Sequence, residues 1–253
     1  MSQRDLGMWV RSSLEELAST DLKPVDVAVL DTGIDATHPD LAGRISDAYR
    51  ISENDGKFAI AKQPADQNSD SVGHGTGVAS VIARLAPNAR IVDIRVLGDV
   101  SKGSGAAVLA GLKLALELRV RVVNISLALK TTYAAQLWQL SELAYRQNQI
   151  IVAARRNMPL VESGFPAEFS SCVGVDRETF RTPYTIRFRS GDIIEYSAHG
   201  EEVVVASSGG GYTIRTGTSF AAPAVSAFCS LLLGSFPDLR LFELKTILKA
   251  FSI

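Results

Sequence analysis

Short apolar runs alternate with amphipathic segments along most of the chain. Runs with the length and composition of buried strands occur at residues 25–30, 90–97, 121–127 and 150–154. Segments with apolar positions at helical spacing occur at residues 74–86, 105–118, 132–147, 218–236 and 241–251. This alternation predicts a three-layer α/β/α fold, in which a mostly parallel central sheet is covered on both faces. Sites in such folds lie at the carboxyl ends of the strands.

The pattern changes between about residue 165 and residue 216. Short strand candidates in this region are separated by Gly, Ser and Pro, which predicts an irregular and partly antiparallel stretch. No internal repeat, low-complexity block or linker interrupts the chain of 253 residues. We therefore expect one domain over residues 1–253, in which residues 1–22 form an N-terminal helical or extended segment.

Composition and charge exclude several classes of protein. The formal net charge is −1 and no Lys/Arg run suggests a nucleic-acid groove. The N-terminus lacks the residue order of a signal peptide, and no apolar run reaches the ~18 residues that span a bilayer. We expect no nucleic-acid partner, no membrane association and a cytoplasmic location. Cys172 and Cys229 have no metal-ligand spacing, so we expect buried free thiols.

Three segments carry candidate chemistry. Asp31 ends a buried strand in VLDTGID, where a carboxylate often only caps a turn. His74 lies between glycines at a helix start in GHGTGVAS, and histidine is the side chain best suited to move a proton near neutral pH. Ser219 opens an apolar helix in GTSFAAP, where serine is usually an N-cap. The free N–H groups and positive dipole end of that helix would also stabilise an oxyanion.

Together the motifs DTGID, GHGT-x-VA and GTS-x-A-x-P resemble the subtilase family, in the order Asp, His, Ser that is typical of it. The resemblance extends from about Val25 to Leu233. It implies a subtilisin-like serine endopeptidase in which Ser219 attacks the scissile carbonyl, His74 transfers the proton and Asp31 orients the imidazole. An acyl-enzyme follows and is hydrolysed by water. The resemblance also implies no cofactor, and a protein or peptide substrate bound as an extended strand.

The same resemblance implies an oxyanion hole. By its position after the strand at 150–154, Asn157 matches the amide that donates to the oxyanion in the family, with the Ser219 backbone N–H as the second donor. Asn124 is the rival amide, but it matches a structural position in its strand. The resemblance further assigns substrate-binding positions to Gly103, Ser104, Gly105, Ser126, Leu127, Ala128, Arg156 and Thr218.

The chain departs from the family at the predicted cleft. Arg155 and Arg156 replace the Ala-Gly that precedes the oxyanion Asn, and the Gly helps to line the primary specificity pocket. Either both arginines turn to the surface, or Arg156 alters the pocket so that it accepts acidic side chains or is partly blocked. Leu129 replaces a Gly and should narrow the cleft.

The same motifs bear on metal binding and on other possible functions. The helix after His74 runs directly into Leu85-Ala86-Pro87 and leaves no room for a calcium loop, so we expect no metal there. His38 and His199 lie in turn segments and are predicted to be structural or solvated. The main alternative is a catalytically weak or inactive subtilase-fold protein that binds peptides. A dinucleotide enzyme or a G-x-S-x-G esterase fits less well, because KGSGAAV lacks the third glycine and Ser219 lacks that elbow.

Overall fold

A computed structural model describes residues 14–54, 57–98, 105–157 and 163–253 of the chain. Its strands are β1 (Val25–Asp31), β2 (Ile45–Asn54), β3 (Lys57–Gln63), β4 (Ala89–Arg95), β5 (Val122–Ile125), β6 (Ile150–Ala154), β7 (Val173–Glu178), β8 (Ile186–Phe188), β9 (Tyr196–His199), β10 (Val203–Ala206) and β11 (Tyr212–Arg215). Its helices are α2 (Leu14–Ala18), α3 (His74–Leu85), α4 (Gly105–Glu117), α5 (Ala134–Arg146), α6 (Thr218–Ser235) and α7 (Leu241–Ala250), with the short 3-10 turns η1 (Ala65–Gln67) and η2 (Thr131–Tyr133).

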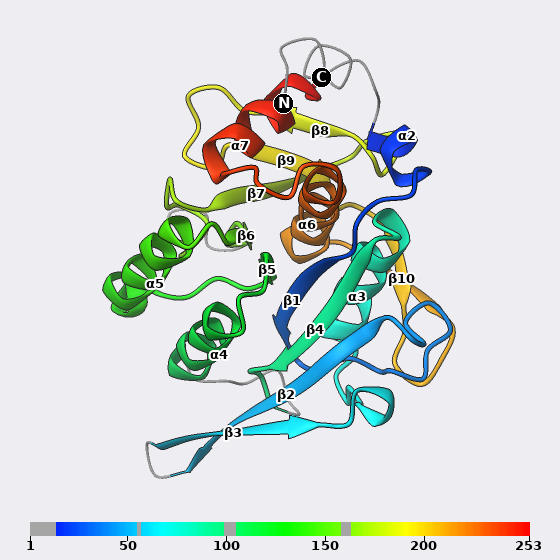
Figure 1. Cartoon of the computed structure of the whole chain (residues 1–253), viewed down its shortest axis with the longest axis vertical. Coiled ribbons are helices and arrows are strands. Elements are labelled where there is room, and N and C mark those ends of the chain that lie inside the picture. Colours follow the sequence, from blue (N-terminus) through cyan, green and yellow to red (C-terminus); the bar gives the residue numbers. More distant parts are fainter. Residues whose placement is uncertain (1–13, 55–56, 99–104, 158–162) are drawn as a thin grey trace.

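Within the described residues, nine strands form one sheet in the order β3-β2-β4-β1-β5-β6-β7-β9-β8 (Figure 1). The seven strands from β2 to β9 in that order pair in parallel, and only β3 and β8, at the two edges, run antiparallel to their neighbours. β10 and β11 form a separate antiparallel hairpin. The predicted mostly parallel central sheet is therefore confirmed.

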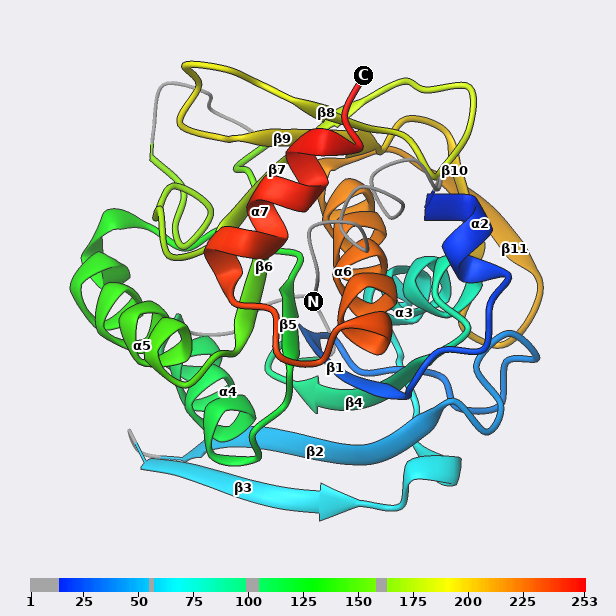
Figure 2. The same ribbon diagram turned by 45° about the horizontal axis from the view of Figure 1, so that its top comes forward.

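Helices cover both faces of this sheet (Figure 2). α4 and α5 pack against one face, and α3, α6 and α7 pack against the other. The alternation of side chains along β1 divides the core accordingly: Val27 and Val29 face α3 and α6, whereas Ala28 and Leu30 face α4. Strands that are buried on both faces consist of continuous apolar runs, which is why these strands could be predicted from the sequence. The three-layer α/β/α prediction is confirmed.

Helix α6 is the apolar centre of one layer. By length and composition it could cross a membrane, but 94% of it is buried inside the fold, against α3 and the strands β1, β5, β6 and β7. Burial of a helix on all sides explains why it carries no polar face. At the N-terminal end, α2 places Leu14 and Leu17 in the same apolar cluster.

One element was not predicted. The hairpin β2–β3 extends the sheet beyond β4, and β3 forms its outer edge with Phe58 and Ile60 exposed (Figure 1). Because this edge is half solvated, its apolar and polar residues mix and give no clear strand signal. The stretch from 165 to 216 is partly antiparallel as predicted, through β8–β9 and β10–β11, but β7 and β9 continue the parallel sheet.

Candidate active site

Asp31 is the last residue of β1, a strand at the centre of the sheet between β4 and β5. Its side chain is fully buried, and Oδ1 accepts a hydrogen bond of 2.8 Å from the Thr32 N–H. The chain then turns at Gly33, whose φ of 107° is a conformation that favours glycine. A buried strand followed by a sharp turn thus holds one carboxylate at the carboxyl edge of the sheet.

His74 is the first residue of α3, and its Nδ1 lies 2.7 Å from Asp31 Oδ1. Since a carboxylate only accepts, Nδ1 carries the hydrogen and Nε2 is left as the basic nitrogen. The ring keeps 31% of its side-chain surface exposed, so it is accessible to a substrate. The sequence prediction that these two side chains meet, 43 residues apart along the chain, agrees with this geometry.

The start of α3 is held close to β1 by glycine and threonine. The Gly75 N–H donates to Thr32 Oγ1 at 2.9 Å. A Cβ added to Gly75 would lie 2.2 Å from the Gly33 carbonyl oxygen and 3.0 Å from Asp31 Cβ. The glycine after His74 is therefore required for the close approach that brings the imidazole to the carboxylate.

Charge around His74 raises the pKa of its imidazole above the ordinary value of 6.5. Burial is the largest single influence and acts to lower the pKa, but the charge of Asp31 and its hydrogen bond together outweigh it. The charge of Asp70 raises the pKa further, and that of Arg215 lowers it. The imidazolium form, which arises when a base has taken a proton, is thus stabilised at this position.

Asp70 belongs to a buried network that sequence reasoning missed. Its Oδ2 accepts hydrogen bonds from the Thr76 N–H and hydroxyl, at 3.0 and 2.8 Å. Thr76 Oγ1 in turn accepts from the Asp35 N–H at 3.0 Å. The network fixes the first turn of α3 to the loop after β1. The sequence contained one signal, a carboxylate four residues before the histidine, but nothing in the pattern showed what it contacts.

Ser219 lies in the first turn of α6, with 8% of its surface exposed. Its carbonyl accepts a hydrogen bond of 2.9 Å from the Ser126 hydroxyl, and the ring of the next residue, Phe220, lies 5.4 Å from that of His74. Among the described residues no hydrogen bond joins the Ser219 hydroxyl to His74. Such bonds are often long in enzymes without substrate and tighten when it binds.

The two candidate amides have different surroundings. Asn124 is fully buried in β5, where its Nδ2 donates to the Ser126 hydroxyl and its Oδ1 accepts from Ser226, both at 2.9 Å. Asn157 is exposed, and its Oδ1 lies 3.2 Å from the Thr218 backbone N and 3.1 Å from its hydroxyl. These contacts occupy the acceptor of Asn157 and leave its NH₂ group as a donor.

Arg155 and Arg156 differ in orientation. The Arg155 guanidinium pairs with Asp176 in β7, which also pairs with Arg189, so it points into a half-buried ion-pair network rather than into solvent. Arg156 Nη1 donates to the Ser163 carbonyl at 3.3 Å, at an exposed position. Its Cβ crowds Gly164, since a Cβ added there would lie 2.6 Å from it.

Some of the predicted substrate-binding positions lie together: a Cβ added to Gly164 would lie 2.6 Å from Arg156 Cβ and 3.2 Å from Ala128 Cβ. Leu127 and Ala128 are partly exposed after β5, and Leu129 forms an antiparallel bridge with Phe165 through two backbone hydrogen bonds of 2.8 and 3.2 Å. Gly105 begins α4 and faces the Tyr133 ring, which lies 2.3 Å from where its Cβ would be. The positions Gly103 and Ser104 lie outside the described residues. Ser126–Ala128 thus lies between β5 and this bridge, and Ser126 contacts the first turn of α6.

The remaining histidines and the cysteines serve the fold. His38 Nε2 lies 2.9 Å from the Gly211 carbonyl, and the His199 Nδ1 accepts from the Phe180 N–H at 3.2 Å. Cys172 and Cys229 are buried free thiols, and burial raises the pKa of Cys172 to about 12. The described residues contain no group of three or more His, Cys, Asp or Glu side chains that could hold a metal ion.

An aspartate–histidine pair at the carboxyl edge of a parallel sheet, beside a serine in the first turn of a buried helix, defines a serine hydrolase of the three-layer α/β/α class. A sequence model described as the Subtilase family matches residues 23–250, so the chain belongs to the subtilase family. It is 28% identical over 219 residues to thermitase from Thermoactinomyces vulgaris, covering 81% of this chain and 74% of that protein.

Two further comparisons agree with the family. The chain is 29% identical over 242 residues to subtilisin DY from Bacillus licheniformis, covering 89% of this chain and 82% of that protein. Among solved structures, a cold adapted subtilisin-like serine proteinase superposes with a TM-score of 0.71 at 25% identity, over 92% of this chain and 83% of that one. The chain is therefore a subtilisin-like serine protease, a hydrolase, as the motifs predicted.

Proposed function

We propose that this protease is an endopeptidase in which Asp31, His74 and Ser219 form the catalytic triad. Ser219 Oγ attacks the scissile carbonyl while His74 Nε2 takes its proton, and the same nitrogen then gives the proton to the leaving amine. Asp31 keeps the hydrogen on Nδ1 and stabilises the imidazolium. The observation that carries the proposal is the 2.7 Å contact between Asp31 Oδ1 and His74 Nδ1.

The oxyanion formed in this attack would be bound by the Asn157 amide and the Ser219 backbone N–H. Support comes from the contacts of Thr218, which occupy the Asn157 oxygen and leave the NH₂ group as a donor. The acyl-enzyme that results is then hydrolysed by water activated by His74. An extended substrate would pair with the backbone at Ser126–Ala128 in the manner of an added strand.

The test compares wild type with Ser219→Ala and with Ser235→Ala, a matched serine at the other end of α6. We expect wild type and Ser235→Ala to digest an unfolded protein at internal bonds and to react with a fluorophosphonate probe, and Ser219→Ala to do neither. Peptide mapping would place the probe on Ser219. A folded wild-type protein that cuts nothing and takes up no probe would instead support the inactive, peptide-binding alternative.

A further inference from the structure

Asp93 is a carboxyl group buried inside the sheet itself. It lies in β4 beside Val29 of β1 and Ala48 of β2, and none of its surface is exposed. Because its side chain alternates with Val92 and Ile94, it projects to the face covered by α3. An apolar residue would be expected at such a position, since a buried charge is costly.

The contacts of Asp93 are incomplete. The Asn68 side-chain NH₂ donates to Oδ2, whereas Oδ1 is buried without a hydrogen-bond partner in the described part of the chain. Burial raises the pKa of Asp93 to about 8, and the nearby charges of Asp70 and Asp31 raise it as well. The Asn68 hydrogen bond and the charge of Arg95 act in the opposite direction. The group therefore carries its proton over most of the neutral range.

Asn68 connects Asp93 to the catalytic pair. It begins a short segment, residues 68–76, that contains both Asp70 and His74. The Asn68 carbonyl accepts from the Ala36 N–H at 3.1 Å, so the residue is fixed on one side to the loop after β1 and on the other to β4. Asp70 then anchors the first turn of α3 through Thr76. Thus Asp93 contacts the start of the segment whose end carries the imidazole.

Resting on the proposed function of Asp31 and His74, we propose that Asp93 is a positioning residue of the active site: it holds Asn68 and the His74-bearing segment against β4, and its charge state acts on the Asp31–His74 pair. The charged and titratable groups that face it are Asp31 from β1, Asp70 from the segment before α3, and Arg95 from β4. The neighbouring residue of β2, Ala48, is apolar.

The direction of the effect follows from the charges. When Asp93 loses its proton, a further negative charge appears close to Asp31 and Asp70, which already favour the imidazolium form of His74. The ionisations of Asp93 and His74 are therefore coupled. Loss of the Asp93 proton raises the pKa of His74, so the titration of His74 extends to higher pH. Replacing Asp93 by Asn keeps the shape and an oxygen for Asn68 but removes the ionisation.

The test uses ¹⁵N-histidine NMR between pH 5 and 10 in the Ser219→Ala background, which prevents self-digestion and needs no activity. With Asp93 present, we expect the His74 resonances to show a second displacement with a midpoint near pH 8. Asp93→Asn should give a single step at lower pH. Asn68→Ala should move the second displacement upward, because it removes a hydrogen bond that favours the charged form. Asp26→Asn, a surface position in β1 paired with Arg90, is the matched control and should change nothing.

Activity provides the second measurement. In the protein that retains Ser219, Asp93→Asn should leave kcat/KM at pH 6.5 nearly unchanged, because Asp93 is protonated there, and should increase kcat/KM near pH 8–9 relative to pH 6.5 by roughly twofold or more. His74 titration curves that superimpose with and without Asp93 would overturn this inference. An inactive wild-type enzyme with the two-step NMR titration intact would overturn the proposed function and leave the role of Asp93 standing.

Discussion

The carboxylates of Asp31, which is buried, and Asp176, which is partly buried, have different partners. Asp176 is paired with two guanidinium groups, so it is stable as a charge and serves the fold. Asp31 Oδ1 accepts from the Thr32 N–H and lies within hydrogen-bond distance of His74 Nδ1, whereas Oδ2 is buried without a hydrogen-bond partner in the described residues. Because Asp31 has so few partners, the imidazolium form of His74 is the main counter-charge for its carboxylate. This arrangement favours the uptake of a proton by the histidine.

At Asn157 the side-chain amide should act mainly in the transition state. We expect Asn157→Ala to lower kcat roughly 10²–10³-fold with little change in KM, because the donor faces charge that develops only after attack. Steady-state kinetics on a peptide substrate measures both constants. Asn157→Asp, which keeps the shape of the side chain but loses both hydrogen-bond donors, should lower kcat in the same way. A rise in KM at unchanged kcat would show that Asn157 binds substrate instead.

At His74 the raised pKa sets the lower pH limit of activity. The imidazole must be neutral to take the serine proton, so kcat/KM should fall as the pH decreases, with a midpoint above the ordinary histidine value of 6.5. The pH profile of kcat/KM between pH 5 and 9 tests this. His199→Gln should leave the profile unchanged, because His199 only accepts from the Phe180 N–H. A midpoint at or below 6.5 contradicts the charge arrangement around His74.

At the scale of elements, the site depends on how closely α3 approaches the turn after β1. The helix begins at His74 and has no side-chain cap at Gly73. Its first turn is held instead by tertiary contacts, through Thr32 on Gly75 and through Asp70 on Thr76. Helix α6 is positioned in a similar way, because Ser126 from the end of β5 holds the Ser219 carbonyl.

Gly75→Ala tests this approach. The added Cβ would overlap the Gly33 carbonyl at 2.2 Å, so α3 must move away from β1 and separate His74 from Asp31. We expect a loss of kcat/KM of about 100-fold or more, since small displacements of reacting groups are costly. The measurement is kcat/KM together with the melting temperature.

The matched control is Gly234→Ala in the last turn of α6, where a Cβ would lie 2.4 Å from Asn88 Nδ2 and 2.9 Å from the Lys23 carbonyl oxygen, before the amino ends of β4 and β1. It should also lower the melting temperature but keep most of the kcat/KM of the folded protein. Equal losses of kcat/KM in both variants would indicate that Gly75 acts only through global stability.

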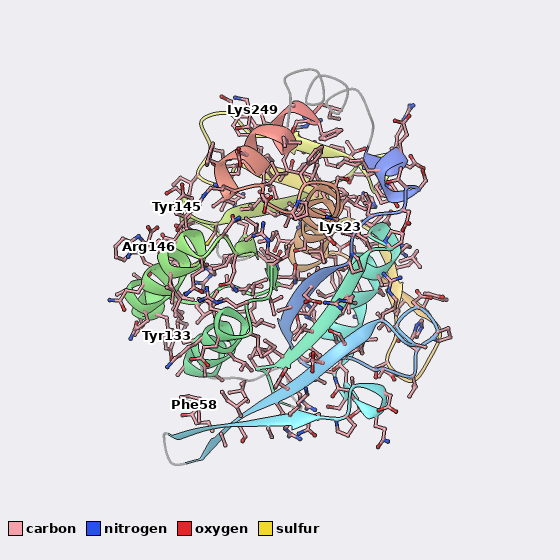
Figure 3. The ribbon with its side chains drawn as sticks, in the orientation of Figure 1. Lys23, Phe58, Tyr133, Tyr145, Arg146 and Lys249 are labelled. Carbon is pink, nitrogen blue, oxygen red and sulfur yellow. The ribbon has the colours of Figure 1, made fainter. Side chains whose placement is uncertain are left out.

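At the scale of the whole molecule, the sheet joins two regions that the sequence keeps apart. The residues up to α4 supply Asp31 and His74, and the last third of the chain supplies Ser219 on α6, which packs across β1, β5, β6 and β7. Side chains drawn over the ribbon fill the space between these layers (Figure 3). The three proposed triad residues can therefore come together only when the sheet joins both regions.

The Arg155–Asp176–Arg189 network should stabilise the C-terminal part of the sheet, since it links the ends of β6 and β7 to the residues after β8. We expect Asp176→Asn to lower the free energy of unfolding by about 1–3 kcal/mol at pH 7, because two partly buried guanidinium groups lose the negative charge that they share. Its side-chain exposure of 13% makes solvent screening weak. Urea unfolding in the Ser219→Ala background measures the change.

The stability difference between wild type and Asp176→Asn should depend on pH. Burial acts to raise the pKa of Asp176, but hydrogen bonds from Arg155, Arg177 and Arg189 outweigh it and lower the pKa below 3.8. The advantage of wild type over Asp176→Asn is therefore complete above pH 3.8 and disappears as the pH falls through the lowered pKa. An advantage that persists unchanged at lower pH would contradict a charge-based role.

The sequence by itself determined the three layers, the mostly parallel direction of the buried strands and the three motifs. Burial on both faces gives unbroken apolar runs, and the motifs combine a strand-end aspartate with a histidine and a serine at helix starts. It did not determine the β2–β3 hairpin, whose half-solvated strands mix residue types, or the direction of Arg155. Only the tertiary structure decided that Asn124 forms hydrogen bonds inside the fold while the Asn157 oxygen accepts from Thr218, and that Asp93 faces the segment carrying His74. These outcomes depend on contacts between residues far apart in the chain, and no local pattern of polar and apolar positions records them.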